Sequence, residues 1–247
     1  MTRGPGRGGL RCATWNVHRA VGPDGRFAPD RVIDAIAAEI VPFAPRVLAL
    51  QEADADDPPH GGLLDMGRLA RETGLRSVHD GRDMRWSERD GGFLGNVLML
   101  DPAMAVRRRL VVALPGLAPR AAVLAEVVRD GAPLRVVSCH LSLSQALRAA
   151  QLRTVGRVVA RAEPMPTVLL GDLNEWRPWG GLALSRRITG MALSGPARRT
   201  FPSGRPVLAL DRILADGGVP VRDVRALDGP LVRSASDHRP LVGLVGP

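Results

Sequence analysis

Two distant stretches of the chain follow one plan, and this repeated plan limits the folds that the chain can adopt. Each stretch has a strand-like run, a helical pattern and a second strand-like run: TWNVH, 30–41 and LALQE in the first, and SCHLS, 143–162 and LLGDLN in the second. Strands that are joined through a helix usually run parallel. Their carboxyl ends then lie at one edge of a sheet, where open α/β sheets build their sites.

Polar side chains stand at the ends of all four runs. They belong to Asn16 and His18, to Glu52, to His140, and to Asp172 and Asn174. Any one of these residues could simply accept backbone N–H groups or cap a helix. Several carboxylates that converge, however, repel one another unless a cation lies between them. Oxygen donors favour Mg²⁺ or Mn²⁺ over zinc, so we expect one of these cations, with Glu52 as its best single ligand.

The C-terminal segment SDHRPL contributes a further acid and a histidine. We place Asp237 and His238 in the turn before the last strand, where both can reach the site. The run LALDRIL puts Asp211 in the middle of an apolar strand, where an unpaired carboxylate is costly. We expect His238 to be its partner, because a carboxylate fixes the tautomer of a histidine and raises its basicity. A salt bridge to Arg212 is the alternative.

Two further residues are candidates for contact with a substrate. Asn96 follows a glycine within the strand-like run 93–100, and its amide could hold a phosphate or orient a histidine; it could equally be a bulge residue. Arg120 enters a strand after the segment LAP and is a candidate phosphate contact.

Short apolar runs separated by Gly, Pro and Asp predict strands along the whole chain. We expect them at 11–17, 46–51, 93–100, 106–113, 121–129, 133–140, 166–170, 207–214, 220–226 and 239–244. A third helix is expected at 63–73, ending before Gly74. No Pro-, Gly- or Ser-rich linker divides the chain, which predicts a flexible tail at 1–9 and a single α/β domain at 10–247.

Composition narrows the functional classes. The formal net charge is +9, and all the basic residues counted in it are arginines. A positive charge suits phosphate-rich partners, although the coding bias of a GC-rich genome explains the arginine content equally well. Cys12 and Cys139 lie in apolar runs and are expected to be buried free thiols, which fits a reducing cytoplasm. No apolar run is long enough for a transmembrane segment. No G-x-G-x-x-G motif follows a strand and opens a helix, which disfavours a dinucleotide-binding oxidoreductase.

The motifs taken together resemble the endonuclease/exonuclease/phosphatase superfamily of deoxyribonuclease-like, metal-dependent phosphohydrolases. They are, in the order of the family, TWNVH, LALQE, GNVLML, SCHLS, LLGDLN, LALDRIL and SDHRPL, and they span about residue 10 to 245. The resemblance implies a four-layer α/β sandwich, in which two mixed β-sheets pack face to face with helices on the outside. It also implies metal-dependent cleavage of a phosphate ester bond.

The resemblance further implies a role for each matching position. Asn16, Glu52 and Asp237 would lie at the Mg²⁺ or Mn²⁺ ion, with Glu52 as a direct ligand. Asp172 would position or deprotonate the attacking water, Asn174 would hold a phosphate oxygen, and His140 would face the phosphate. His238, oriented by Asp211, would serve as the acid–base or phosphate-stabilising histidine.

The substrate stays open among phosphate esters. A phosphodiesterase or nuclease is the leading interpretation; a phosphomonoesterase or a sphingomyelinase-like phospholipid phosphodiesterase would use the same scaffold. A non-catalytic binder of nucleic acid or lipid is disfavoured because the polar set is complete. Specificity is expected in the loops 53–62, 80–92 and 175–181, whose candidate contacts are Arg85, Trp86, Trp176, Arg177 and Trp179. Nucleic acid, a phospholipid headgroup and a small phosphodiester all remain candidate partners, and no obligate protein partner is implied.

Overall fold

Two mixed β-sheets form the centre of the protein in the computed structural model, which describes residues 8–58, 60–177 and 181–246. Most of the tail expected at 1–9 lies outside these residues. The first sheet has the order β10 (Val221–Ala226), β11 (Leu241–Val245), β1 (Leu10–Asn16), β2 (Val47–Gln51), β4 (Val97–Leu100) and β3 (Arg76–Ser77). The second has the order β5 (Ala105–Leu114), β6 (Arg120–Arg129), β7 (Ala132–His140), β8 (Thr167–Asp172) and β9 (Asp211–Ala215).

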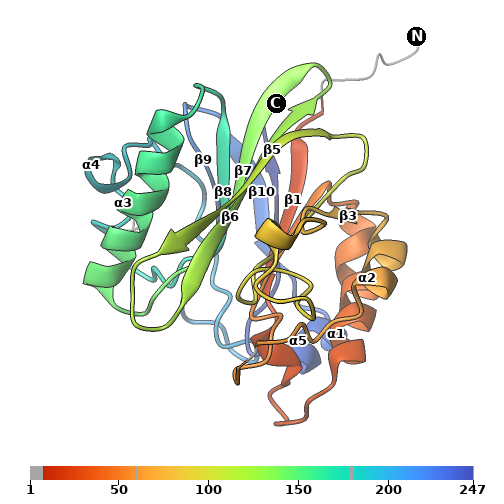
Figure 1. The fold of residues 1–247 in the computed structure, drawn as a ribbon. Coiled ribbons are helices and arrows are strands. Elements are labelled where there is room, and N and C mark those ends of the chain that lie inside the picture. Colours follow the sequence, from red (N-terminus) through yellow and green to blue (C-terminus); the bar gives the residue numbers. More distant parts are fainter. Residues whose placement is uncertain (1–7, 59, 178–180, 247) are drawn as a thin grey trace.

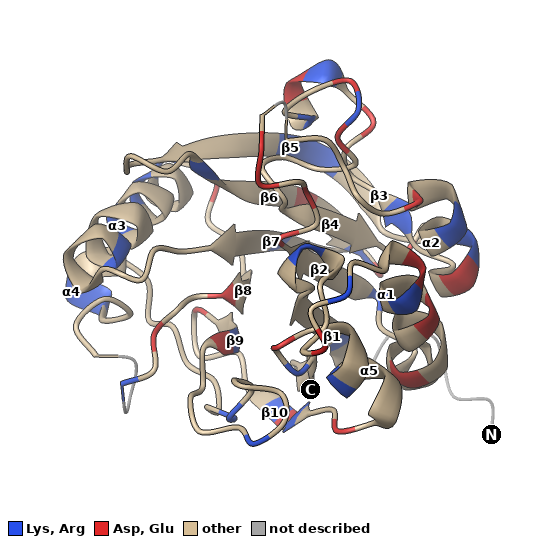
Figure 2. Cartoon of the chain, turned by 90° about the horizontal axis from the view of Figure 1, so that it is seen from below, with Lys and Arg blue, Asp and Glu red and all other residues tan. Residues whose placement is uncertain are grey.

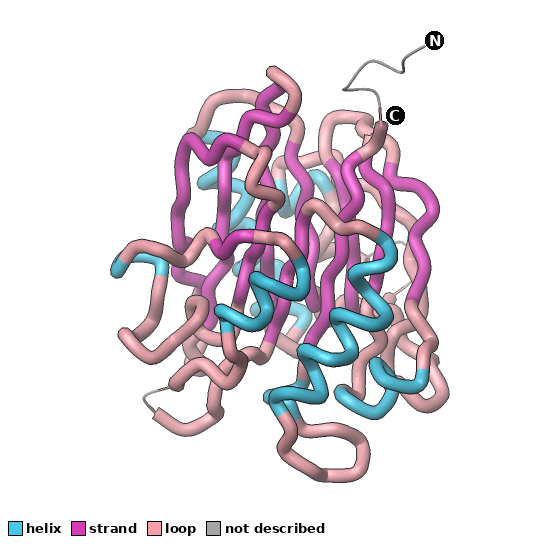
Figure 3. The backbone as a smooth tube through the Cα atoms, turned by 90° about the vertical axis from the view of Figure 1, so that its right-hand side faces the viewer, coloured by secondary structure: helices cyan, strands magenta, loops and turns pink. Residues whose placement is uncertain are grey.

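Helices cover the outer faces of both sheets, which gives four layers (Figure 1, Figure 3). The first sheet is covered by α1 (Pro29–Ala35), α2 (Met66–Thr73) and α5 (Pro230–Ala235), and the second by α3 (Gln145–Arg161) and α4 (Arg186–Thr189). The four-layer sandwich that the sequence predicted is thereby confirmed. None of the helices in the described ranges is both long and apolar enough to cross a bilayer.

Three apolar clusters hold these layers together. The cluster between the sheets includes Val47 from β2 and Leu170 from β8, both essentially inaccessible to solvent. A second cluster packs the first sheet against α1, α2 and α5, and a third packs the second sheet against α3 and α4. Strands whose two faces are both covered in this way read as continuous apolar runs. This explains why LALQ and VLLG show no alternation of polar and apolar residues.

Three expected elements differ in extent from those observed. The helix expected at 30–41 is divided into α1, a π-helical turn at Ile36–Ile40 and a 3₁₀ turn at Val41–Phe43, where Pro42 lacks the N–H that would continue a helix. The strand expected at 93–100 begins only at Val97, because Phe93 and Asn96 pair across a turn. The strand expected at 207–214 begins at Asp211, so this carboxylate stands at the start of β9 and not in its middle.

The two parallel pairs occupy different sheets, whereas the sequence placed all their ends at the edge of one sheet. β1 pairs with β2 in the first sheet, and β7 pairs with β8 in the second. Because the two sheets face each other, the carboxyl ends of all four strands nevertheless meet at the same end of the sandwich. Figure 2 views the molecule from this end, where the acidic residues of β8 and β9 lie side by side.

Candidate active site

Asn16 connects the two sheets at the end where the four strands terminate. Its Nδ2 atom donates a hydrogen bond to Glu52 Oε1, 3.1 Å away, and another to Asp172 Oδ2, 3.0 Å away. Glu52 follows β2 of the first sheet, and Asp172 ends β8 of the second. Three of the predicted site residues therefore meet, although more than a hundred residues separate Asn16 from Asp172.

Gly171 permits the close approach of β7 and β8 that places Asp172 at the site. A Cβ atom on Gly171 would lie 1.9 Å from the carbonyl oxygen of Cys139, and its φ of +135° suits only glycine. The next residue pair in register is His140 and Asp172. A glycine that interrupts an apolar strand is therefore what allows an imidazole and a carboxylate to stand next to each other.

Asn174 closes a turn on Asp172. Its backbone N–H donates to Asp172 Oδ1 at 3.0 Å, and its Nδ2 atom donates to the carbonyl oxygen of Leu141 at 2.9 Å. Both Asp172 and Asn174 are buried. Side chains of Asp and Asn commonly fix turns in this manner. The carboxylate that follows the buried strand is thus held in one orientation, with Oδ2 directed toward the neighbouring polar groups.

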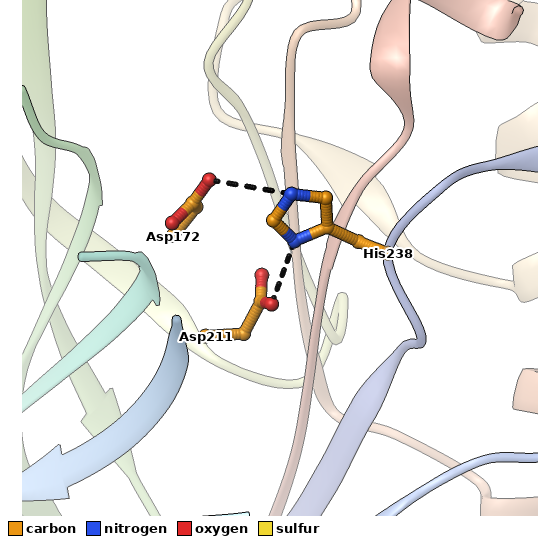
Figure 4. Close-up of side chains that lie close together, drawn as sticks. All are labelled: Asp172, Asp211 and His238. Carbon is orange, nitrogen blue, oxygen red and sulfur yellow. Dashed lines mark hydrogen bonds and ion pairs between the residues drawn. The ribbon is translucent and has the colours of Figure 1, made fainter. Parts of the chain in front are cut away.

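His238 stands between two carboxylates (Figure 4). Its Nδ1 atom lies 2.8 Å from Asp211 Oδ2, and its Nε2 atom lies 3.9 Å from Asp172 Oδ2. Arg212, the alternative partner for Asp211, donates instead to the carbonyl oxygen of Glu175. Asp211 also accepts a 2.5 Å hydrogen bond from the hydroxyl of Thr200.

The turn that carries His238 is anchored to the end of β1. Trp15 Nε1 donates to the carbonyl oxygen of His238 at 2.9 Å, and Ser236 Oγ donates to the carbonyl oxygen of Asn16 at 2.7 Å. The Phe201 ring packs against the imidazole with a centroid separation of 4.9 Å. Thr200, Phe201 and Ser236 were missed by the sequence analysis. Nothing in their local sequence marks them, since each acts through a contact distant in the chain.

Burial and neighbouring charges shift the pKa values of these groups in different directions. Burial raises the pKa of Asp172 to about 6, and repulsion from Asp211 adds to this effect. Burial alone would lower the pKa of His238, but the adjacent Asp211 carboxylate outweighs it and raises that pKa to about 10. Burial, together with the charges of Arg120 and His238, lowers the pKa of His140 well below its ordinary value. Near neutral pH the site therefore holds a carboxylate, an imidazolium and a neutral imidazole.

Among the residues expected at a metal ion, Asp237 has an oxygen atom without a hydrogen-bond partner, whereas Glu52 and Asn16 use theirs. Asp237 Oδ1 is buried without a hydrogen-bond partner, and its closest ionic neighbour is His18 Nδ1 at 3.7 Å. Glu52 Oε2 accepts from Arg19 Nη1 at 3.1 Å, so a cationic group already neutralises it. Burial raises the pKa of Asp237, and the charge of Glu52 adds to the rise. An oxygen-rich set in which carboxylates repel each other fits a hard divalent cation.

A second group of side chains could also hold a cation. One ligand atom each from Asp172, Asp211 and His238 lies within 4.8 Å of the others, and all three residues are buried. In the described part of the chain this is the one such cluster with three or more acidic, histidine or cysteine ligands. Because His238 Nδ1 already bonds Asp211, this group is better suited to proton transfer than to a complete coordination sphere.

Strained backbone surrounds the site. His18, Arg19 and Ala20 have φ angles of +46°, +50° and +58°, and Glu52 and Asn174 have φ angles of +54° and +51°. Residues other than glycine rarely adopt this left-handed region, and those that do tend to cluster at functional sites. Arg19, which belongs to this stretch, forms ion pairs with Glu52 and with Asp56, whose Oδ1 lies 2.8 Å from Arg19 Nη2. Arg19 is a site residue that periodicity and composition gave no means of predicting.

Two adjoining cavities open at this end of the sandwich. The larger, of about 330 Å³, is lined by Asn16, Glu52, Arg120, His140, Leu143, Asp172, Asn174, Trp176, Phe201, Leu208, Leu210 and His238. The smaller, of about 110 Å³, shares Glu52, Arg120 and His140 with it and adds Arg19, Asp54, Asp56 and His60. Arg120, one of the predicted phosphate contacts, therefore borders both cavities.

Asn96 has a different place from the one predicted. It is buried below the cavities and lines neither of them. Its Nδ2 atom donates to the carbonyl oxygens of Ala121 and Ser138, and its Oδ1 atom accepts from the Ser138 hydroxyl. Since both amide hydrogens are used by backbone carbonyls, Asn96 ties the first sheet to β6 and β7 and has no donor left for a phosphate.

Of the aromatic and arginine side chains expected at the site from the loops, some lie at the larger cavity and others lie elsewhere. Trp176 lines the larger cavity, and the Arg177 guanidinium lies 5.1 Å from its ring centroid. Trp86 instead packs edge-on against Phe93, and Arg85 donates to the carbonyl oxygen of His79. Both line a separate cavity of about 380 Å³ and neither lines the two cavities at the candidate site. Trp179 lies outside the described residues.

Known proteins resemble this chain in sequence and in fold. Residues 13–238 match the model of a family described as the endonuclease/exonuclease/phosphatase family. No curated protein shows significant similarity to the chain. Among solved structures, an endonuclease/exonuclease/phosphatase from Beutenbergia cavernae is 25% identical, with a TM-score of 0.64 over 97% of this chain and 72% of that one.

Two more distant structures share the fold. D. rerio TDP2, in complex with a single-strand DNA product, is 16% identical, with a TM-score of 0.68 over 96% of this chain and 99% of that one. The mannosyl-6-phosphatase Bt3783 of Bacteroides thetaiotaomicron is 15% identical, with a TM-score of 0.70 over the same shares.

Proposed function

The chain belongs to the endonuclease/exonuclease/phosphatase family, and from this premise we propose that it is a divalent-metal-dependent phosphodiesterase. Family membership supports hydrolysis of phosphate esters in general. The observation that carries the proposal is the row formed by Asp211, His238 and Asp172, in which one imidazole stands between two buried carboxylates. A phosphodiester is anionic and resists attack, so its cleavage requires a base, a proton donor and charge neutralisation.

The chain's own residues can supply the proton transfers. Asp172, ionised above about pH 6, accepts a proton from an attacking water. His238, held protonated by Asp211, directs Nε2 toward the same space and stabilises the phosphate oxygens or the leaving oxygen. Asp211 acts as a positioning residue, since its carboxylate bonds the imidazole of His238 and the hydroxyl of Thr200.

Donors around this row would hold the phosphate. Arg120 borders both cavities and brings a positive charge, and His140 presents an imidazole between Glu52 and Asp172 at 3.7 and 3.6 Å. Asn174 donates one of its two Nδ2 hydrogens to Leu141, and the second hydrogen would donate to a phosphate oxygen. These groups replace the water that solvates the phosphate in solution.

Glu52, Asn16 and Asp237 are the residues that would hold Mg²⁺ or Mn²⁺. The unpartnered Oδ1 atom of Asp237 and the oxygen-rich donor set support this assignment. A bound divalent cation would neutralise phosphate charge and lower the pKa of water near the ester.

The arrangement of the cavities favours a diester over a monoester. The two cavities adjoin at Glu52, Arg120 and His140, which leaves space on both sides of a phosphate bound there. A monoester fills only one side. Among proteins that share the fold, one is described in complex with a single-strand DNA product and another as a mannosyl-6-phosphatase.

The test is hydrolysis of bis-p-nitrophenyl phosphate and of p-nitrophenyl phosphate, with Mg²⁺ or Mn²⁺ and with EDTA. We expect faster turnover of the diester and loss of activity in EDTA. Exclusive turnover of the monoester would make the protein a phosphomonoesterase. Turnover of neither compound, nor of DNA, RNA or phospholipid, would favour a binding role. Undiminished activity in EDTA would exclude the metal-dependent mechanism.

A further inference from the structure

The larger cavity has two unlike walls. One wall carries the carboxylate, amide and imidazole groups of the candidate site. The other is formed by five apolar side chains, from Leu143, Trp176, Phe201, Leu208 and Leu210. A group that fills this cavity beside a bound phosphate would therefore contact hydrocarbon and not further charge.

Four exposed apolar side chains, which we call the apolar rim, line the larger cavity or are next in sequence to residues that line one of the two cavities: Leu117, Leu143, Trp176 and Val207. Leu117 is fully exposed, and Leu143 is 79% exposed. Leu143 and Trp176 line the larger cavity, Val207 precedes its lining residue Leu208, and Leu117 precedes Ala118 of the smaller cavity. Eight large apolar side chains are exposed in the described ranges, and half of them belong to this rim. Scattered exposed leucines need no explanation, but a group at the mouth of a site does.

The turn between β5 and β6 supports a lipid contact most directly (Figure 1). Its residues 115–119, PGLAP, are all exposed, and none of them is charged. A nucleic-acid contact depends chiefly on cations that face phosphates, and this turn offers none. Apolar side chains that insert at a lipid interface need no charge at their tip, provided that cations lie at headgroup level nearby.

Cations do lie near the rim. Arg177 stacks over Trp176, and Arg205 is exposed two residues before Val207. The formal net charge of the chain is +9, which attracts it to an anionic surface. Apolar side chains accompanied by Arg177 and Arg205 are complementary to a bilayer that carries anionic headgroups.

We propose that the apolar rim docks on an anionic lipid surface and that the phosphodiester cleaved by the site is presented there. This inference rests on the proposed phosphodiesterase function and names its substrate class. The phosphate would reach the polar wall, while the aliphatic part of the ester would lie along Leu143, Phe201 and Leu208.

The test is co-sedimentation of the full chain with vesicles in EDTA, so that binding is measured without turnover. Vesicles of phosphatidylcholine alone are compared with vesicles that also contain phosphatidylglycerol. We expect binding to the anionic vesicles, and a loss of about tenfold or more in affinity for Leu117→Ser and for Leu143→Ser, because each removes a leucine from the lipid contact. Leu231→Ser is the matched control, since this exposed leucine of α5 is not in the rim, and it should bind like the wild type.

Parallel hydrolysis of bis-p-nitrophenyl phosphate separates this inference from the proposed function. Leu117 lines neither cavity, so Leu117→Ser should hydrolyse this soluble ester at the wild-type rate. A wild type that is active but does not bind anionic vesicles would overturn the lipid inference alone. So would equal binding by Leu117→Ser, Leu143→Ser and wild type, or a stronger effect of these changes on an oligonucleotide than on vesicles. Vesicle binding by a chain with no hydrolytic activity would overturn the proposed function instead.

Discussion

The Asp172→Asn variant should be more stable than the wild-type protein at neutral pH, although it should be inactive. Burial, with repulsion from Asp211, raises the pKa of Asp172 from its ordinary 3.8 to about 6 in the folded state. A carboxyl group whose pKa is higher in the folded than in the unfolded protein contributes its full stability at a pH below the unfolded pKa. This contribution is lost as the pH rises through the folded pKa of about 6. At neutral pH the ionised Asp172 therefore destabilises the fold that holds it.

The size of the effect follows from the two pKa values. Each unit corresponds to about 1.4 kcal/mol, so ionising Asp172 costs about 3 kcal/mol near pH 7.5 and about 1 kcal/mol near pH 4.5. The asparagine removes this cost but loses the hydrogen bond from Asn16 Nδ2, worth about 1 kcal/mol. The net gain is about 2 kcal/mol near pH 7.5 and close to zero near pH 4.5. For a chain of 247 residues this corresponds to a rise in Tm of about 4–8 °C.

The assay is thermal unfolding followed by circular dichroism, in EDTA, at both pH values. Asp90→Asn is the matched control, because Asp90 is buried outside both cavities and burial also raises its pKa to about 6. It should gain stability in the same pH window while retaining hydrolytic activity. If Asp172→Asn is less stable than the wild type near pH 7.5, or if its advantage does not grow with pH, the electrostatic argument for Asp172 is wrong.

Three further results are expected. In Asp211→Asn the pKa of His238, raised to about 10 in the wild type, should fall toward or below its ordinary 6.5, as measured by NMR of the imidazole nitrogens in EDTA. A wild-type ring that titrates near 6.5 would contradict the pairing. Gly171→Ala should lose about 3 kcal/mol or more in urea unfolding, because its Cβ would overlap the carbonyl oxygen of Cys139; an unchanged midpoint would refute this. Mg²⁺ should raise the Tm of the wild type but not that of Glu52→Gln, and equal shifts in both would remove Glu52 from the cation site.

The strands and helices could be predicted from the sequence because their signals are local, whereas the four-layer sandwich was implied by the resemblance to a known family. Runs such as VLLG, covered on both faces, identify strands, and Gly74 marks the end of α2 with a left-handed φ of +67°. The boundaries that failed lie where a turn interrupts an apolar run. Leu208 and Leu210 resemble strand residues in sequence, but they line the larger cavity ahead of β9.

Site residues could be predicted only where they stand next to apolar, strand-like runs. Glu52 and Asp172 follow apolar runs, and His238 lies in the turn before one, which made them visible in the sequence. Thr200 and Arg19 could not be found in this way, because one depends on a contact with Asp211 and the other on three consecutive left-handed residues. The prediction for Asn96 failed for a related reason, since its two donors are satisfied by carbonyls of the opposite sheet.

The most direct test of the account is the rate of metal-dependent hydrolysis of bis-p-nitrophenyl phosphate by Asp172→Asn, relative to wild type and to Asp90→Asn. The account predicts a loss of about 10³-fold in kcat for Asp172→Asn, because the proton acceptor beside His238 is gone, and wild-type turnover for Asp90→Asn. A correctly folded Asp172→Asn that turns over as fast as the wild type would contradict it.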